Sequence, residues 1–531
     1  MSVAGVLADL FAEVRAWRCR TQPDSFDDLP RVPRPAGWVA DWSAGAVRAR
    51  RAALRTFQSR HAALDLAGAP VPVQVDGRVL GVVLARAEWE LEHLRGWQRN
   101  PWFAFDQCLQ PVYRTLLAFG PVDGEVVLRH LRRIPRTAAD CAATMAGQVS
   151  APYAEVTIPA LGRVRDDLAA AMAELDLPAA LRPALARATA DAVDALAGFE
   201  RWLRDHRDRF APASPIGPDA LRFLLHRVAL VPYSPDQILD LAAAEWNRAV
   251  AAEAVLRRRF RERPPLCASA AEQIARQRRD LAAVRRFRVD RGLLGPVPGD
   301  YRFERLPGHL KPLTWLGVLD DLDEAVRYIP EPAEDLPYFQ LADALDPRLG
   351  ICHEGVHAEQ FALGARHPDP ARRHFVDSTP NEGIAFYHEE LMRTAGLFDD
   401  APAAAVVLAN FQRLRALRAE VDIALALGEL TIEAAADRLA AAVPMDAQTA
   451  WEEAVAFAAN PGQGLSYLVG KAQVTDLVAA AVGSGVDIRD CHDRLWREGN
   501  VPLVLQHWEA LGDRSRLDAA DRLAGQPSST S

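Results

Sequence analysis

The sequence predicts a mainly α-helical protein. From residue 5 to about residue 260, stretches rich in Ala, Leu and Arg place apolar residues at helical spacing, with Pro or Gly between the stretches. Residues 403–442 predict two further helices, and Asn460-Pro461-Gly462-Gln463 introduces another. Hydrophobic residues make up 50% of the 531 residues, which is enough for a large buried core.

A proline-rich joint from Pro212 to Pro218 suggests where this helical chain divides. We expect an N-terminal helical lobe over residues 1–212, a second helical lobe over residues 213–520 and a disordered tail over residues 521–531. Length alone does not decide whether the two lobes are separate domains. One segment departs from the helical pattern: Val71 to Val83 has two β-branched runs around Asp76-Gly77, which predicts a small β-hairpin.

Composition excludes several classes of protein. The 62 basic and 71 acidic residues give a net charge of −9, which argues against a nucleic-acid partner bound by bulk charge. Residues 256–291 concentrate arginine, but acidic residues are mixed in and aromatic residues are few, so a solvated helix face is favoured. Attraction of anionic groups of a substrate is a minor alternative for this segment.

No membrane or export signal is expected either. The N-terminus has no basic leader followed by a long apolar run, and no stretch offers about 18 uninterrupted apolar residues. The six cysteines are scattered, without a Cys-x-x-Cys pair, and therefore predict reduced thiols in a cytoplasmic protein.

The motif His353-Glu354-Gly355-Val356-His357 is the strongest indication of a functional site. On a helix, two histidines four residues apart lie on one face, so both imidazoles can bind one Zn²⁺, and Glu354 is placed to polarise a water on the metal. With 13 histidines in the chain, such a motif arises by chance in roughly two chains per hundred. The motif therefore predicts a metallohydrolase, provided that a third ligand exists.

Glu382, which lies 25 residues after His357, is the expected third ligand. Two His and one Glu, with a fourth position open to water, form the catalytic zinc site of one class of peptidases, and a third ligand from a separate helix is typical of gluzincins. Thr379-Pro380-Asn381-Glu382 also fits a capping box, in which Glu382 would turn back to its own backbone. The histidine motif favours the ligand role, with Co²⁺ or Mn²⁺ as alternatives to Zn²⁺.

Further motifs resemble a known bacterial family. The sequence is similar to the family called domain of unknown function 885 in His353-Glu354-Gly355, Glu382-Gly383-x-Ala385-x-Tyr387, Pro461-Gly462-Gln463-Gly464-Leu465-Ser466-Tyr467-x-x-Gly470, His492-Asp493 and Gly499-Asn500-Val501-Pro502-Leu503, and more weakly in Gly217-Pro218-Asp219-Ala220 and Tyr233-Ser234-Pro235. The resemblance extends from about residue 215 to residue 510. It implies a large helical, gluzincin-like metallopeptidase fold with a deep cleft.

One departure from that family concerns the metal motif itself. The family usually has His-Glu-x-x-Pro-Gly-His-His-x-Gln, whereas two residues are missing here and the chain has His353-Glu354-Gly355-Val356-His357-Ala358-Glu359-Gln360. The expected metal geometry is therefore closer to that of angiotensin-converting enzyme and thimet oligopeptidase. Substrate preference does not transfer from ordinary members of the family.

Related gluzincins also imply roles for residues outside the ligand set. They supply a Tyr or His from a late helix to stabilise the oxyanion, and Tyr467 and His492 fit this role by their order along the chain, with Tyr387 as a further candidate. A core tyrosine and a surface histidine are the alternatives. Gluzincins also pair an extended substrate with a short strand, for which we expect Tyr338 to Leu341, with Tyr338 and Gln340 as substrate-binding residues; an ordinary connector is the alternative.

Together these features predict a zinc-dependent hydrolase that cleaves an amide bond in a small peptide or peptide-like substrate. His353, His357 and Glu382 would bind one Zn²⁺, and Glu354 would act as general base. Two alternatives remain: an enzyme recruited to one specialised reaction of a small metabolite, and a non-catalytic helical binding protein. The presence of Glu354 argues against the second, while the oligomeric state cannot be read from the sequence.

Overall fold

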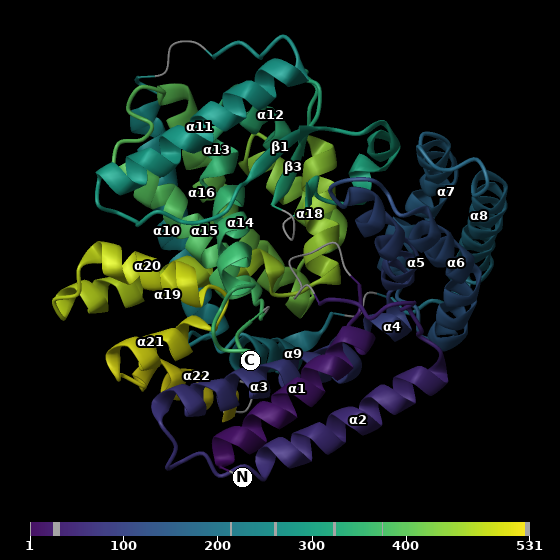
Figure 1. Cartoon of the computed structure of the whole chain (residues 1–531), viewed down its shortest axis with the longest axis horizontal. Coiled ribbons are helices and arrows are strands. Elements are labelled where there is room, and N and C mark those ends of the chain that lie inside the picture. The colour runs from purple at the N-terminus through teal and green to yellow at the C-terminus, as the bar shows by residue number, and fades with distance from the viewer. Residues whose placement is uncertain are drawn as a thin grey trace. The chain divides into compact units, whose positions relative to one another are not determined.

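The computed structural model is mainly α-helical, as the sequence predicts (Figure 1). It describes residues 2–24, 32–212, 215–259, 263–321, 325–373 and 375–525. Within these residues, β-structure is limited to three short strands and an isolated bridge between Ser150 and Ala211, and no helix has the length and apolar character needed to cross a membrane. The chain forms two compact units: residues 1–69, 83–214 and 306–328 make the first, and residues 70–82, 215–305 and 329–531 make the second.

The first unit is a helical assembly with a small β-element. Its core lies among α5 to α8, where Phe105, Leu109, Leu131 and Leu161 are buried. Strand β2 pairs antiparallel with β3. Its elements are α1 (Val3–Thr21), α2 (Ala44–Ala62), η1 (Trp89–Leu94), α4 (Gly96–Arg99), α5 (Pro101–Leu117), α6 (Gly124–Met145), α7 (Ala151–Ala173), α8 (Arg182–Asp205), η2 (Arg207–Arg209), η4 (Gly308–Leu316), β2 (Asp320–Asp321) and β3 (Val326–Ile329).

The second unit contains every residue singled out above as a candidate for function. Its elements are α9 (Gly217–Phe223), η3 (Leu224–Val228), α10 (Pro235–Leu256), α11 (Ala270–Asp290), β1 (Arg302–Arg305), α12 (Tyr338–Leu345), α13 (Arg348–Ile351), α14 (Glu354–Gly364), α15 (Ser378–Thr394), α16 (Pro402–Leu427), α17 (Ile432–Ala442), α18 (Ala447–Ala459), α19 (Gln463–Gly483), α20 (Ile488–Glu498), α21 (Leu503–Leu511) and α22 (Ser515–Gly525). Helices α15 and α16 both pack against α19, which therefore lies at the centre of this unit.

The predicted hairpin at residues 71–83 is wrong, because these residues form the first part of helix α3 (Val71–Glu88), which passes from the second unit into the first. Val75, Val79 and Val82 are fully or almost fully buried, and their spacing of four and three residues places them on one face of a helix. The same valines produce the β-branched runs, so burial on a helical stripe overrides their preference for strands. Pro72 lies in the first turn, where it is tolerated.

The predicted edge strand at Tyr338 to Leu341 is also wrong, since these residues begin helix α12. Pro337 occupies the position before the helix, and Asp446 Oδ2 accepts a hydrogen bond from the backbone N–H of Tyr338 at 3.1 Å. The proline-rich run therefore leads into a capped helix instead of continuing as an extended strand.

The end of the chain is helical for longer than predicted. Helix α22 continues through Gly525, and Leu517 and Ala520 anchor it in the core, so residues 521–525 of the predicted tail are helical. Residues 526–531 lie outside the described residues.

Contact between helix backbones fixes the spacing of α15 and α19. A Cβ added to Gly470 would lie 2.1 Å from the carbonyl oxygen of Thr379 and 2.6 Å from Cα of Gly383. A Cβ added to Gly383 would in turn lie 2.4 Å from the backbone of Gly470. Both positions therefore require glycine, and this is a physical reason for the two glycines in the motifs Glu382-Gly383 and Tyr467-x-x-Gly470.

Candidate metal centre

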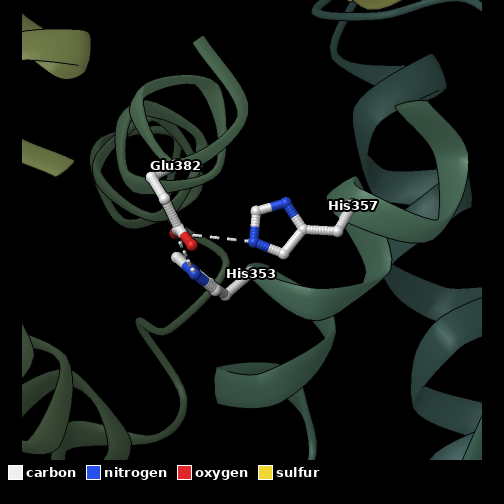
Figure 2. Close-up of side chains that lie close together, drawn as sticks. All are labelled: His353, His357 and Glu382. Carbon is white, nitrogen blue, oxygen red and sulfur yellow. Dashed lines mark hydrogen bonds and ion pairs between the residues drawn. The ribbon is translucent and has the colours of Figure 1, made fainter. Parts of the chain in front are cut away.

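His353, His357 and Glu382 converge in the second unit (Figure 2). His353 occupies the position before α14, His357 lies one turn into that helix, and Glu382 lies in the second turn of α15. Nε2 of His353 and Nε2 of His357 lie 3.1 and 3.5 Å from Oε2 of Glu382. All three residues are buried, with exposed fractions of 7%, 2% and 1%. Glu382 faces the histidines and does not act as the cap of its own helix; Asp377 occupies the N-cap and accepts from the N–H of Thr379.

The three donor atoms fit the requirements of a zinc ion. In a tetrahedral site, two ligand atoms that are each about 2.1 Å from the metal lie about 3.4 Å apart. The observed separations of 3.1 and 3.5 Å match this value, and the three atoms lie within 4.8 Å of one another. Two imidazoles and one carboxylate also form a donor set that suits zinc. His353, His357 and Glu382 would therefore hold the metal.

Glu389 orients His353 through Nδ1, the ring nitrogen that does not face Glu382. Its Oε1 lies 2.8 Å from Nδ1 of His353, and it is itself fully buried. When Nε2 binds a metal, Nδ1 must carry the proton, so the imidazole donates to Glu389 and its tautomer is fixed. Arg415 NH2 donates to the same Glu389 oxygen at 2.7 Å and holds the carboxylate in place.

Sequence reasoning did not identify Glu389 or Arg415. Glu389 follows Glu382 by seven residues, which is two helical turns and the same face of α15. A second acidic residue at that spacing was the available signal. Arg415 comes from α16 and has no such signal in the sequence.

We predict that Glu389→Gln lowers metal affinity roughly 10- to 100-fold, because the amide cannot supply the negative charge that raises the basicity of His353. Competition with a chromophoric chelator measures the affinity. Glu390→Gln is the matched control on the same helix, since Glu390 pairs with Lys471 instead of a histidine. Equal affinities for the two variants would contradict the role given to Glu389.

Tyr467 lies beside the candidate ligands. Its ring stacks on that of His353 with centroids 6.0 Å apart and an interplanar angle of 18°. The guanidinium of Arg418 lies 4.7 Å from the centroid of the Tyr467 ring. Glu354 is half-buried at the first position of α14, directly after His353.

Tyr387 and His492 form a separate pair. The Tyr387 hydroxyl lies 2.9 Å from Nε2 of His492, whose Nδ1 donates to the carbonyl oxygen of Leu293 at 2.6 Å. Burial lowers the pKa of His492 and raises that of Tyr387. Their hydrogen bonds to each other and to the backbone fit a neutral imidazole that accepts from the tyrosine, in the apolar cluster around Trp496.

The two expected substrate-binding residues lie on α12. The Tyr338 ring packs edge-on against Phe411 with centroids 5.6 Å apart, and burial raises the pKa of Tyr338. Gln340 is half-buried on the same helix. Neither residue belongs to a strand, so the expected pairing of a strand at these residues with the backbone of an extended substrate is wrong.

The helix that contains His357 is fixed by a buried ion pair. Arg288 of α11 donates to both oxygens of Glu359, at 2.9 and 2.7 Å, and Trp496 Nε1 donates to Glu359 Oε2 at 3.1 Å. Burial by itself raises the pKa of Glu359, but Arg288 outweighs this effect and holds the pKa below its ordinary value. The arginine-rich segment is therefore not a uniformly solvated face, because Arg288 is 4% exposed.

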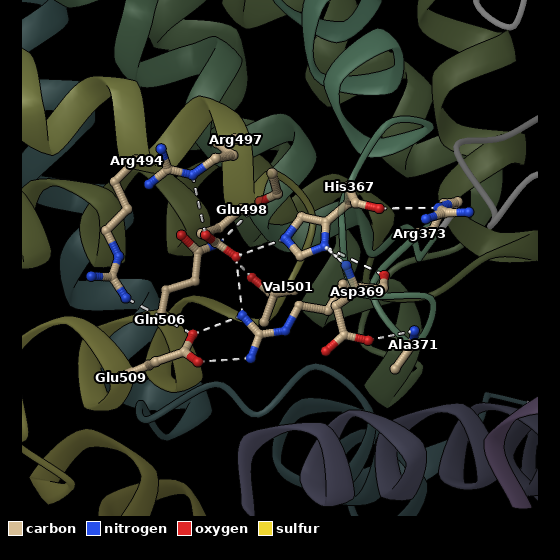
Figure 3. Close-up of polar contacts among 12 residues, drawn as sticks. His367, Asp369, Ala371, Arg373, Arg494, Arg497, Glu498, Val501, Gln506 and Glu509 are labelled. Carbon is tan, nitrogen blue, oxygen red and sulfur yellow. Dashed lines mark hydrogen bonds and ion pairs between the residues drawn. The ribbon is translucent and has the colours of Figure 1, made fainter. Parts of the chain in front are cut away.

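The loop between α14 and α15 is anchored by charged side chains (Figure 3). Arg372 in this loop donates to Glu509 at 2.7 and 2.8 Å, to Glu498 at 3.0 Å and to Asp76 at 2.9 Å. His367 Nε2 lies 3.1 Å from Glu498. Burial raises the pKa of Glu498, but His367 and Arg372 together outweigh this effect and lower the pKa to about 2. These contacts fix the loop that joins the helix of His357 to the helix of Glu382.

The helix that contains Tyr467 is capped by a buried carboxylate from α16. Asp422 accepts hydrogen bonds at 3.0 Å from the backbone N–H groups of Gly462 and Leu465, at the start of α19. Gly462 has φ of 97°, a conformation that favours glycine. Burial raises the pKa of Asp422 to about 7, against the lowering effect of these backbone donors. The Pro461-Gly462-Gln463-Gly464 motif thus forms a capped helix start that positions Tyr467.

We predict that Asp422 makes the protein less stable as the pH rises from about 4 to about 7. Because the pKa of Asp422 is higher in the folded chain than in the unfolded chain, its contribution is fully present below pH 4 and is lost as the pH passes through 7. The shift corresponds to a free energy on the order of 4 kcal/mol. Urea unfolding of the wild type and of Asp422→Asn at several pH values measures this contribution. The difference in the free energy of unfolding between the two proteins should change from pH 4 to pH 7. Free energies that vary with pH in parallel would contradict the raised pKa of Asp422.

The chain belongs to a family of bacterial proteins of unknown function, DUF885, whose family model matches residues 32–292 and 349–506. The matched residues include all three members of the candidate metal centre. They also extend well into the first unit, where the sequence motifs gave no resemblance beyond helical character.

Two solved structures have a similar fold. One, from Colwellia psychrerythraea, is described as a candidate lipoprotein and is 16% identical, with a TM-score of 0.70 over 99% of this chain and 100% of that chain. The other, from Shewanella oneidensis, is described as a candidate lipoprotein of unknown function and is 14% identical, with a TM-score of 0.68 over 96% of this chain and 100% of that chain. At these identities the likeness concerns the fold alone. No curated protein matches the sequence.

Proposed function

We propose that the protein is a zinc-dependent hydrolase that cleaves an amide bond in a small peptide or peptide-like substrate. The observation that supports this proposal is the convergence of His353, His357 and Glu382, with Glu354 next to the first ligand. A zinc ion bound there would lower the pKa of water toward neutrality and polarise the substrate carbonyl. A helical, gluzincin-like peptidase fold belongs to the same proposal.

The protein's own side chains supply the other steps. Glu354 takes a proton from the attacking water and delivers it to the leaving amine, as a half-buried carboxylate beside the metal site can do. The Tyr467 hydroxyl is the candidate donor to the developing oxyanion, because its ring stacks on His353. Tyr387 and His492 are weaker candidates, since they hydrogen-bond each other. Glu389 and Arg415 keep His353 in its ligand orientation.

Elemental analysis tests the ligand set. We expect about one zinc per chain in the wild type and little or none in His353→Ala and Glu382→Ala, because each variant removes one of three protein ligands. His206→Ala, which changes a histidine outside the cluster, is the control and should retain the metal. Wild-type protein purified without chelators that contains no divalent metal would argue for a non-catalytic binding protein.

A second function has one observation in its favour. The metal motif lacks the two residues that ordinary members of the family have before the second histidine, which fits an enzyme recruited to a specialised reaction of a small metabolite. A screen of general peptides against metabolite amides distinguishes the two functions. The cytoplasmic location inferred from six free cysteines stays a prediction.

A further inference from the structure

Two buried arginines lie next to the candidate metal centre. Arg415 and Arg418 are three residues apart on α16, so they share one face of that helix, and their exposed fractions are 3% and 5%. The Arg418 guanidinium contacts the Tyr467 ring at 4.7 Å, and that ring stacks on His353. Only one aromatic ring therefore separates Arg418 from a candidate metal ligand.

Both guanidiniums have donors that no described residue uses. Arg418 binds Glu453 through Nε at 2.7 Å and through NH2, while its NH1 makes no hydrogen bond within the described part of the chain. Arg415 binds Glu389 through NH2, while its Nε and NH1 are buried without a hydrogen-bond partner among the described residues. Buried donors without acceptors are costly, so native proteins rarely keep unpaired groups such as Nε and NH1 of Arg415 unless another group satisfies them.

Aromatic rings surround these donors and offer no strong acceptor. The Arg418 guanidinium lies 5.4 Å from the Phe339 ring and 5.8 Å from the Phe457 ring, and Arg415 lies 5.4 Å from the Phe411 ring. Such surroundings exclude water, which strengthens the interaction of each guanidinium with a charged acceptor. The carboxylates of Glu389 and Glu453 form ion pairs with Arg415 and Arg418. These pairs fix the position of both guanidiniums without occupying all of their N–H groups.

We propose that Arg418, with Arg415 beside it, binds a carboxylate of the substrate. A carboxylate has two acceptor oxygens and no donor, which matches planar guanidinium donors next to an apolar wall. The substrate class is therefore a peptide or N-acyl amino acid with a carboxylate close to the amide that is cleaved. This inference rests on the proposed hydrolase function, and the carboxylate can be a free C-terminus or an acidic side chain.

Binding to the zinc-loaded Glu354→Gln protein tests the inference without turnover. Calorimetry compares N-acetyl-Ala-Phe with its carboxamide, and N-acetyl-Glu-Phe-carboxamide with N-acetyl-Gln-Phe-carboxamide. We expect the carboxylate to bind roughly 10-fold to 100-fold more tightly in one of the two pairs, as a charge-assisted hydrogen bond provides. The pair that shows the preference identifies the source of the carboxylate. Equal binding within both pairs, including no binding at all, would overturn the inference.

A charge-neutral double variant then tests Arg418 itself. Arg418→Gln with Glu453→Gln leaves no unpaired buried charge, and we expect it to lower the preference below about twofold with the zinc content unchanged. Arg438→Gln with Glu420→Gln removes an exposed ion pair that also involves α16 and should keep the preference. If the double variant fails to fold, Arg418→Lys provides the test instead. It retains the charge beside Glu453 but loses the planar guanidinium, so it should lower the preference for the carboxylate several-fold.

The two proposals fail in different ways. A preference that survives in the Arg418 variants would mean that the carboxylate binds the metal, and would overturn the subsite. Hydrolysis by the wild type without any carboxylate preference would also overturn the subsite, while the hydrolase function would stand. A preference that depends on Arg418, in a protein that hydrolyses none of these peptides, would support the subsite and count against hydrolysis.

Discussion

Glu354→Gln is expected to lower the hydrolytic rate roughly 10²- to 10⁴-fold, which is the usual contribution of a general base. Glutamine has nearly the same shape as glutamate but cannot take a proton from water. Glu354 is outside the converging donor set of His353, His357 and Glu382, so we expect the metal content to stay at about one per chain. The measurement is kcat with the best substrate from the screen, together with elemental analysis of the same sample.

The melting temperature of Glu354→Gln provides the control for folding. Since Glu354 is half-buried and the substitution keeps its shape, the melting temperature should stay close to that of the wild type. A variant that binds zinc, melts normally and retains near-native activity would remove Glu354 from the mechanism. The proposed hydrolysis would then need a different base.

Gly470→Ala is expected to destabilise the protein by about 1–3 kcal/mol or more, because overpacking of a well-packed contact typically costs this much. The new methyl group would lie 2.1 Å from the carbonyl oxygen of Thr379, and both atoms belong to helix backbones that cannot rotate away. Helix α15 must therefore move from α19, which shifts Glu382 relative to Tyr467. We expect reduced activity together with reduced stability.

Gly483→Ala is the matched control for this substitution. It lies on the same helix α19, but a Cβ there meets no atom within 4 Å. Alanine has the higher helix propensity, so this variant should be as stable as the wild type or slightly more stable. Urea unfolding of both variants measures the difference, and equal stabilities would contradict the close packing of α15 on α19.

The sequence allowed the helical fold class and the three candidate ligands to be predicted because both depend on local spacing. His353 and His357 lie one turn apart, and the helices have clear apolar periodicity and Pro or Gly boundaries. The prediction of a hairpin at residues 71–83 was wrong because the same valines fit the pattern of a strand and that of a helix. Only their burial on one helical face decides between the two.

The remaining parts of the site depend on contacts between distant residues. Arg415 and Arg418 reach the site from α16, and no spacing in the sequence relates them to His353 or Tyr467. In the same way, the order of residues along the chain suggested Tyr467 and His492 as oxyanion donors, but it gave no sign that His492 hydrogen-bonds Tyr387. Residue order alone does not contain such tertiary proximity.

The contact of Gly383 with Gly470 also determines how this unit can move. No side chain separates the two backbones, so α15 and α19 cannot slide past each other without a clash. Glu382 and Tyr467 must then move together as a rigid body during thermal fluctuations. In the proposed hydrolase, an opening that admits a substrate would therefore have to come from elements other than α15 and α19, and the backbones that carry the third ligand and the candidate oxyanion donor would keep their spacing.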